Sequence, residues 1–145
     1  NSENIRVVRF SSAFKTVALT LEGYCEEAPA YWNAVCAIDT TYSAKQLLSV
    51  LQQLELAQGR VRKARWQERT LDLDLLSYDT EVICDAHLSL PHPRLAERIF
   101  VLQPFAEIAA DYELPQWNKS VGELLAMQSD KWAGIVEKRE NWLTL

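Results

Sequence analysis

The chain of 145 residues has only four glycines, and its apolar runs are all short. So few glycines exclude both a dinucleotide-binding fingerprint and a Walker phosphate loop in their usual forms. No apolar segment approaches the ~20 residues that cross a bilayer, and no basic segment followed by an apolar one forms a leader. We therefore expect a soluble, cytoplasmic protein that has no membrane partner.

Cysteine is also scarce, with only Cys25, Cys36 and Cys84 in the chain. Their odd number and the lack of a paired CxxC motif argue against a disulfide framework and against a zinc site. We expect Cys36 and Cys84 to be small core residues in strands.

Composition and charge limit the remaining classes. Hydrophobic residues make up 48% and charged residues 24% of the chain, which is typical of a folded protein, and the length predicts one domain over residues 1–145. The net charge of -5 argues against nucleic acid or an anionic membrane as a partner. The segment "RVRKARWQER" (60–69) is basic, however, and is either a solvated loop or the binding region for an anionic partner.

Hydrophobic periodicity predicts alternating elements in the first half of the chain. Near-helical spacing of apolar residues predicts a helix over 4–15, and β-branched and small apolar residues predict strands over 16–21 and 33–41. Ser43 and Gln46 have the spacing of a capping box, which predicts a helix from there to about Gly59. Its expected apolar stripe consists of Leu47, Leu48, Leu51 and Leu54.

The second half continues this alternation. Strands are predicted over 70–76 and 81–85, and a helix over 94–109 with an interruption at Pro104. A second capping box, Ser120 with Glu123, predicts a short helix that ends at Met127. The order of elements predicts an α+β sandwich with a largely antiparallel sheet.

The segment "RTLDLDLL" (69–76) places Asp72 and Asp74 in an otherwise apolar stretch. In a strand these two side chains would share one face about 7 Å apart, while the leucines would face the core. A wet outer face explains this pattern, but aspartate is depleted in strands and two like charges on one face repel each other. Paired carboxylates with room for water and phosphate oxygens also suit Mg²⁺, so a metal site remains the alternative.

The segments "RVRKARWQERTLDLDLL" and "LSLPHPRLAERIFVLQPFAEIA", with "LELAQGR" and "YWNAV" upstream, resemble the signature region of the 6-hydroxymethyl-7,8-dihydropterin pyrophosphokinases. The resemblance covers most of residues 31–110. It implies a ferredoxin-like α+β fold and the transfer of pyrophosphate from ATP to a reduced pterin in folate biosynthesis, with release of AMP. ATP and the pterin are then the expected partners of a monomer, and association with other folate enzymes stays open.

The resemblance also implies a role for particular residues. Two Mg²⁺ ions would be held by Asp72 and Asp74. The catalytic arginines would be Arg60 and Arg69, which bind phosphate oxygens or close over the pterin. Around the nucleotide the implied residues are Gln52, Glu55, Arg62, Lys63, His92 and Arg98. The implied pterin site consists of Tyr31, Asn33, Trp66 and Phe100.

The chain also differs from the pattern of this family at several places. The family has a leading strand that ends in Gly-Ser-Asn, whereas this chain opens with "NSENIRVV", so that strand is missing from this sequence and either precedes it or is absent from the protein. "RWQER" stands where the family has Arg-Trp-Gly-Pro-Arg. A second hypothesis is therefore a catalytically weak relative that binds pterin or nucleotide as an interaction or regulatory module. A third, a nucleic-acid-binding domain, lacks the aromatic strand motif of RNA-recognition modules.

Overall fold

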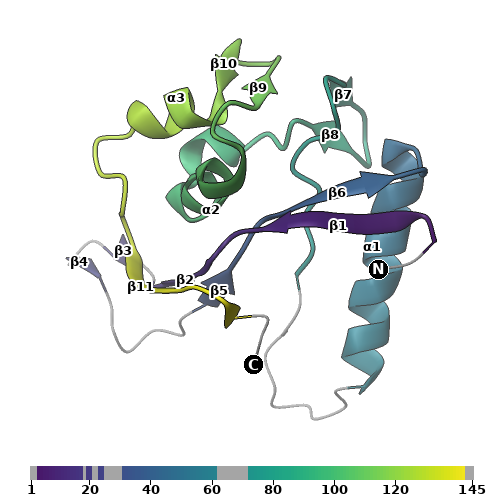
Figure 1. The fold of residues 1–145 in the computed structure, drawn as a ribbon, viewed down its shortest axis with the longest axis horizontal. Coiled ribbons are helices and arrows are strands. Elements are labelled where there is room, and N and C mark those ends of the chain that lie inside the picture. Colours follow the sequence, from purple (N-terminus) through teal and green to yellow (C-terminus); the bar gives the residue numbers. More distant parts are fainter. Residues whose placement is uncertain (1–2, 18, 21–22, 25–30, 62–71, 143–145) are drawn as a thin grey trace.

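The computed structural model describes residues 3–17, 19–20, 23–24, 31–61 and 72–142. Within these ranges α-helices combine with short antiparallel strands, which confirms the predicted α+β class (Figure 1). The strands are β1 (Ile5–Phe10), β2 (Ala13–Thr16), β3 (Leu19–Thr20), β4 (Gly23–Tyr24), β5 (Tyr31–Asn33), β6 (Cys36–Thr40), β7 (Ile83–Cys84), β8 (Ser89–Leu90), β9 (Glu113–Leu114), β10 (Lys119–Ser120) and β11 (Ile135–Arg139). The helices are α1 (Ala44–Val61), the 3-10 helix η1 (Leu95–Glu97), α2 (Ile99–Ala109) and α3 (Val121–Ala126).

Two antiparallel strand pairs form the centre of the molecule. β1 pairs with β6, and β2, the next strand along the chain, pairs with β5. Between the two ladders, the backbone N–H of Ser11 donates to the carbonyl of Val35 (2.9 Å), and the N–H of Val35 donates to Oγ of Ser11 (2.8 Å). The bonds of Ser11 with Val35 therefore connect the β1–β6 ladder to the β2–β5 ladder.

The helix predicted over 4–15 is wrong, because these residues form β1 and β2. The register of β1 against β6 shifts between Val7 and Arg9, as at a β-bulge. A bulge inserts one residue and so interrupts the alternation of inward and outward side chains. The interrupted pattern of Ile5, Val8 and Phe10 resembles the spacing of a helix.

β11 extends the sheet on the other side of β2, in the order β11-β2-β5. The tail, for which the sequence predicted no element, thus contributes an edge strand.

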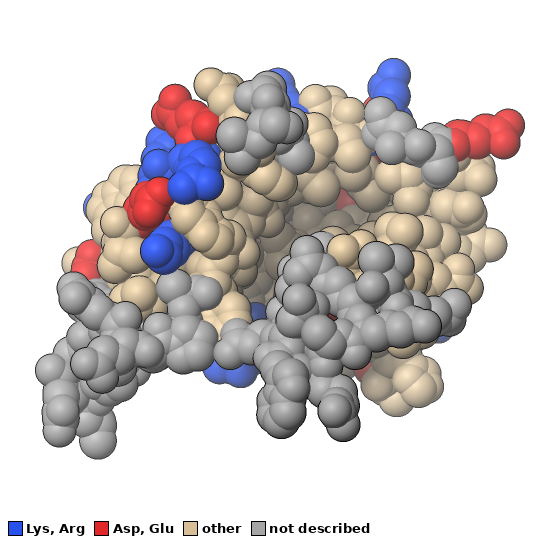
Figure 2. Space-filling view, turned by 90° about the horizontal axis from the view of Figure 1, so that it is seen from below, with Lys and Arg blue, Asp and Glu red and all other residues tan. Residues whose placement is uncertain are grey.

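Figure 2 shows basic and acidic side chains interleaved along one side of the lower face, and a hollow near the centre of that face. On β11 the charges are paired: Lys138 with Glu107 of α2 (3.2 Å) and Arg139 with Glu137 (3.3 Å).

The predicted strand over 33–41 is confirmed as the end of β5 and all of β6. The one predicted over 16–21 is present in two pieces: Thr16 ends β2, Leu19 and Thr20 form β3, Val17 lies in neither strand, and positions 18 and 21 lie outside the described residues. Of the strand predicted over 81–85, only β7 (Ile83–Cys84) is present. Cys36 and Cys84 do lie in strands, but both are exposed free thiols and not core residues as expected.

Helix α1 begins where the sequence predicted. Oγ of Ser43 accepts from the N–H of Gln46 (3.2 Å), and Oε1 of Gln46 accepts from the N–H of Ser43 (2.9 Å), which completes the capping box. The helix ends two residues beyond Gly59. Leu47 is fully buried, but Leu54 is 49% exposed, so the predicted apolar stripe does not extend to the last turns.

Helix α2 packs against β2, β5 and β6. The predicted interruption at Pro104 is wrong, since α2 runs through this buried proline. The break falls at Arg98, whose extended backbone separates η1 from α2. α3 has the predicted capping box, in which Ser120 and Glu123 exchange hydrogen bonds. The main core joins these elements and consists of Leu95, Leu102, Phe105, Leu114, Val121 and Leu124.

No helix among the described residues is both long and apolar enough to cross a membrane.

Candidate active site

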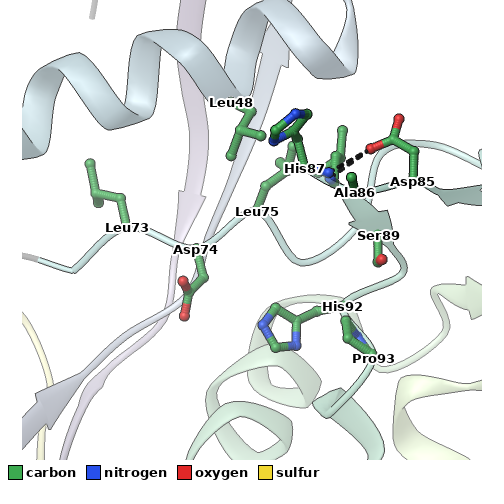
Figure 3. A pocket seen from close by; sticks show the side chains of 11 residues that line it. Leu48, Leu73, Asp74, Leu75, Asp85, Ala86, His87, Ser89, His92 and Pro93 are labelled. Atoms are coloured by element: carbon green, nitrogen blue, oxygen red, sulfur yellow. Dashed lines mark hydrogen bonds between the residues drawn. The ribbon is translucent and has the colours of Figure 1, made fainter.

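A pocket of about 290 Å³ lies between the first turns of α1, the segment around Asp74 and the turn that joins β7 to β8 (Figure 3). Asp74 and His92 lie at one end of this pocket, and the ring of His92 is directed toward Asp74. Leucines form much of the remaining wall. The lining residues are Leu48, Leu73, Asp74, Leu75, Asp85, Ala86, His87, Leu88, Ser89, His92 and Pro93.

The strand predicted over 70–76 is not present in its described part, because residues 72–76 pair with no described strand. The alternation that suggested it is nevertheless real: Asp72 and Asp74 are exposed, and Leu73 and Leu75 are half-buried. Leu75 packs against the small core formed by Ala44, Leu88 and Leu90. Apolar contacts therefore orient the two aspartates outward without a hydrogen-bonded ladder.

His92 is held close to this segment by its backbone. Its N–H donates to the carbonyl of Leu76 (2.8 Å), and its Nδ1 accepts from the N–H of Arg94 (3.2 Å). Burial lowers the pKa of His92, the charge of Asp74 opposes this change, and the charges of Arg98 and Arg94 lower the pKa further. A neutral ring whose Nδ1 accepts carries its proton on Nε2, which can then donate to an anionic ligand.

Arg98 occupies the N-cap position of α2, two residues before Phe100. Its guanidinium carbon lies 5.7 Å from the centroid of the Phe100 ring, which is the geometry of a cation–π contact. The charge of Arg98 also acts on His92, which lines the pocket end that contains Asp74.

Helix α1 presents two further predicted residues toward the same side. Gln52 and Glu55 follow Leu48 by four and seven residues, so they lie on the helix face that lines the pocket. Gln52 is exposed and Glu55 is half-buried. Arg60 belongs to the last turn of this helix.

The predicted pterin residues Tyr31 and Asn33 lie on β5, where their alternate positions place them on one face. Nδ2 of Asn33 donates to Oγ1 of Thr16 on β2 (3.4 Å), and Tyr31 is 54% exposed. Phe100 belongs to α2, which packs against β5. The remaining predicted residues, Arg62, Lys63, Trp66 and Arg69, lie outside the described residues.

Comparison with known proteins decides the family. A family model described as 7,8-dihydro-6-hydroxymethylpterin-pyrophosphokinase matches residues 1–110. The chain belongs to this pyrophosphokinase family. The resemblance seen in the signature segments is therefore confirmed, and the chain is an enzyme of the pyrophosphokinase class.

Three relatives of this pyrophosphokinase carry the same name, 2-amino-4-hydroxy-6-hydroxymethyldihydropteridine pyrophosphokinase. The one from Haemophilus influenzae is 42% identical over 127 residues, which are 88% of this chain and 76% of the relative. The one from Pseudomonas aeruginosa is 43% identical over 69% of this chain, and the one from Bacillus subtilis is 39% identical over 75% of it. The matched part spans 61% and 63% of the length of these two relatives.

The carboxylates of this pyrophosphokinase suit one kind of metal. The described residues contain no group of three or more histidine, cysteine, aspartate or glutamate side chains that could hold an ion by themselves. Asp72 and Asp74 instead form an exposed pair of oxygen donors. Mg²⁺ accepts one or two carboxylates when water and substrate phosphates complete its shell, so this donor set fits Mg²⁺.

Sequence reasoning missed the wall formed by the β7–β8 turn, which contains Asp85, His87 and Ser89. Oδ1 of Asp85 accepts from the N–H groups of His87 and Leu88, each at 2.9 Å. The bond from His87, then those from Lys45 and Leu88, hold the pKa of Asp85 at about 2. An aspartate at the start of a tight turn was the available signal, because its side chain commonly bonds to the backbone two residues on.

Proposed function

We propose that this pyrophosphokinase transfers pyrophosphate from ATP to 6-hydroxymethyl-7,8-dihydropterin in folate biosynthesis and releases AMP. One observation carries the proposal: Asp74 and His92 lie at one end of an apolar-walled pocket, and the charge of Arg98 acts on His92, in a chain of this family. A carboxylate for a metal ion, a neutral histidine donor and a permanently charged arginine are what a polyphosphate needs.

The nucleotide fits the pocket with its base toward the leucines and its phosphates toward Asp74. Leu48, Leu73 and Leu75 offer flat apolar contact, as expected for a site that binds a heterocycle. At the other end, Nε2–H of His92 and the guanidinium of Arg98 would donate to phosphate oxygens. Gln52 and Glu55 would face the nucleotide from α1, and Arg62 and Lys63 belong to the proposed phosphate-binding set.

Magnesium belongs to the proposal as two ions held by Asp72 and Asp74. When bound, Mg²⁺ neutralises phosphate charge and lowers the pKa of a coordinated hydroxyl group. The side chains of this chain would align the pterin hydroxyl with the β-phosphorus, and positioning provides most of the catalysis in such a transfer. We assign Arg60 and Arg69 to the charge that develops on the transferred group.

For the pterin, Tyr31 and Phe100 would cover the faces of the ring, together with Trp66. Asn33 would read its amide edge, because a carboxamide offers both a donor and an acceptor. The bond from Asn33 to Thr16 supports this role, since it restrains the amide. Aromatic stacking then supplies affinity, and the amide supplies orientation.

Finer features of the protein belong to the same proposal. They are a ferredoxin-like sandwich, one domain, a monomeric state and a cytoplasmic location. The antiparallel strands with packed helices support the first of these, and the free thiols of Cys36 and Cys84 suit a reducing compartment.

Titration calorimetry of the full-length protein tests the function. We expect a non-hydrolysable ATP analogue to bind with Mg²⁺ and to bind much more weakly with EDTA, and 6-hydroxymethylpterin to bind once the nucleotide is present. With ATP and the reduced pterin, AMP should form only when both are supplied. Binding of both ligands without AMP formation would instead favour the catalytically weak relative.

A further inference from the structure

The β7–β8 turn, which forms one wall of the pocket, is held by a single side chain. Oδ1 of Asp85 accepts from the N–H groups of His87 and Leu88, each at 2.9 Å. The N–H of Asp85 also donates to the carbonyl of Leu88 (3.0 Å), which closes the turn. In Figure 3 the carboxylate of Asp85 lies on the turn, on the far side of the pocket from Asp74 and His92. It therefore acts on the shape of this wall.

The same carboxylate connects the turn to the opposite wall. Oδ2 of Asp85 lies 3.1 Å from Nζ of Lys45, in the first turn of α1. Lys45 precedes Leu48 by three residues, so both lie on one helix face, and Leu48 lines the pocket. Beneath them, buried Leu88 packs in the small core with Ala44 and Leu90. The apolar contact of Leu88 with Ala44 and the ion pair of Asp85 with Lys45 thus both connect the turn to α1.

We propose that Asp85 is a positioning residue for nucleotide binding, because it fixes the shape of the turn that carries His87 and Leu88, which packs against the helix that carries Leu48. This inference rests on the proposed function, in which the base of ATP enters the pocket. If the turn relaxes, the wall moves away from the base and the affinity for ATP falls. The phosphate end of the site, at Asp74 and His92, lies across the pocket and keeps its geometry.

The two bonds to the turn matter more than the ion pair. The side chains of Lys45 and Asp85 are 71% and 36% exposed, and ion pairs at such exposure contribute little because water screens them. The N–H bonds to the carboxylate fix two backbone positions directly, and bonds to an ionised acceptor are strong. A neutral acceptor of the same shape makes weaker bonds but still fixes both backbone positions, so it should keep most of the function.

Five variants separate these contributions. Asp85→Ala removes the acceptor, Asp85→Asn keeps an oxygen at the same place, and Lys45→Gln removes only the ion pair. Glu81→Ala is the matched control, because Glu81 is an exposed acid before β7 that does not line the pocket. Asp85→Glu keeps the charge but displaces the acceptor by one carbon, so it tests the inference even if the alanine variant fails to fold.

The measurement compares two ligands by calorimetry with Mg²⁺: a non-hydrolysable ATP analogue, and inorganic tripolyphosphate, which has no base. For Asp85→Ala we expect about tenfold weaker binding of the analogue and tripolyphosphate binding within about twofold of wild type. Asp85→Glu should weaken analogue binding about fivefold. Asp85→Asn, Lys45→Gln and Glu81→Ala should stay within about threefold of wild type for both ligands.

The outcomes distinguish this inference from the function on which it rests. If the wild-type protein binds neither ligand, both proposals are overturned. If it binds the analogue and makes AMP, but Asp85→Ala and Asp85→Glu bind the analogue as tightly as wild type, only the role of Asp85 is wrong. Equal loss of analogue and tripolyphosphate binding would also overturn that role, because it would show a general structural effect.

Discussion

Asp74 and His92 lie at the same end of the pocket, although they are 18 positions apart in the sequence, and the charge of Asp74 acts on the pKa of His92. The carboxylate opposes the lowering of the His92 pKa, whereas burial and the nearby arginines favour the neutral ring. Neutral His92 therefore offers an N–H donor without adding to the positive charge of Arg94 and Arg98. Single substitutions should separate these roles.

Asp74→Asn should reduce kcat/KM for pyrophosphate transfer by roughly 10²–10³, because the amide keeps the shape but loses the charge needed for a metal ion. The melting temperature should change little, since Asp74 is exposed. AMP formation and a thermal melt measure the two effects. Asp111→Asn, at an exposed acid after α2, is the control, and similar losses in both variants would contradict the proposed role.

His92 should make the stability of the protein depend on pH. Its pKa is lowered in the fold, so as pH falls through about 6.5 the unfolded chain binds a proton before the folded chain does. The free energy of unfolding should therefore fall between pH 7.5 and pH 5.5. Urea denaturation at both pH values should show a smaller decrease for His92→Gln, and an equal decrease would mean that other groups cause it.

At the scale of elements, the sequence predicted best where a local hydrogen bond defines the structure. Both capping boxes were found, because each depends on two side chains three residues apart. β1 was misread as helix because its bulge interrupts the alternation of side chains. Pro104 was misread as a break because its cost is one bond near the start of α2, and burial in the core compensates for it.

In the candidate site, too, the sequence predicted the features that a local pattern reveals and missed those that depend on distant contacts. The signature segments were enough to name the aspartates, His92 and Arg98, because these residues are close in sequence to recognisable neighbours. The β7–β8 turn was missed because Leu88 packs against Ala44 of α1, 44 positions away, which no local pattern reveals. A strand was expected over 70–76 because leucine and aspartate alternate there, but a strand also requires a partner, and the described part, 72–76, pairs with no described strand.

Glu107 connects three elements. On α2, its carboxylate accepts from the backbone N–H of Ser12, which precedes β2, and pairs with Lys138 of β11 (3.2 Å). Burial raises its pKa, but the bonds from Ser12 and Lys138 together outweigh burial and lower it. A hydrogen bond to an ionised group contributes about 1.5–3 kcal/mol, and water screens part of this contribution here because the bond is only partly buried.

Glu107→Gln should therefore reduce the free energy of unfolding by about 1–2 kcal/mol at pH 7. Because the folded-state pKa is lowered, this contribution is present above about pH 4.5 and is lost as pH falls further, so wild type and variant should converge near pH 3. Urea denaturation at the two pH values measures the difference. Glu113→Gln, at an exposed position on β9, should have no such effect; a difference that persists at pH 3 would argue against the charge.

At the scale of the whole molecule, the last described residues close over the first strands. Nε1 of Trp142 donates to the carbonyl of Ser11 (2.9 Å), and its ring packs edge-on against Phe10 with centroids 6.4 Å apart. Trp132 lies against Phe14, and Arg139 lies 4.8 Å from the ring of Trp32. Contacts between opposite ends of the sequence thus stabilise the sheet that carries Tyr31 and Asn33.

Trp142→Ala should destabilise the protein by about 2–3 kcal/mol, because it removes both an aromatic contact and a hydrogen bond to a buried serine. It should also raise the KM for the pterin more than the KM for ATP, since the affected sheet carries the proposed pterin residues. Met127→Ala, at an exposed side chain, is the control. Equal changes in both KM values would mean that the closure affects the whole enzyme.

The position of β11 next to β2 has a consequence for the order of events during synthesis. The elements of the proposed nucleotide site, from α1 to Arg98, all emerge from the ribosome before β11, which begins only at Ile135. At about 5–20 residues per second, the 37 positions from Arg98 to Ile135 take roughly 2–7 s. The sheet with the proposed pterin strand is therefore completed last, and newly made chains should gain nucleotide affinity before they gain pterin affinity.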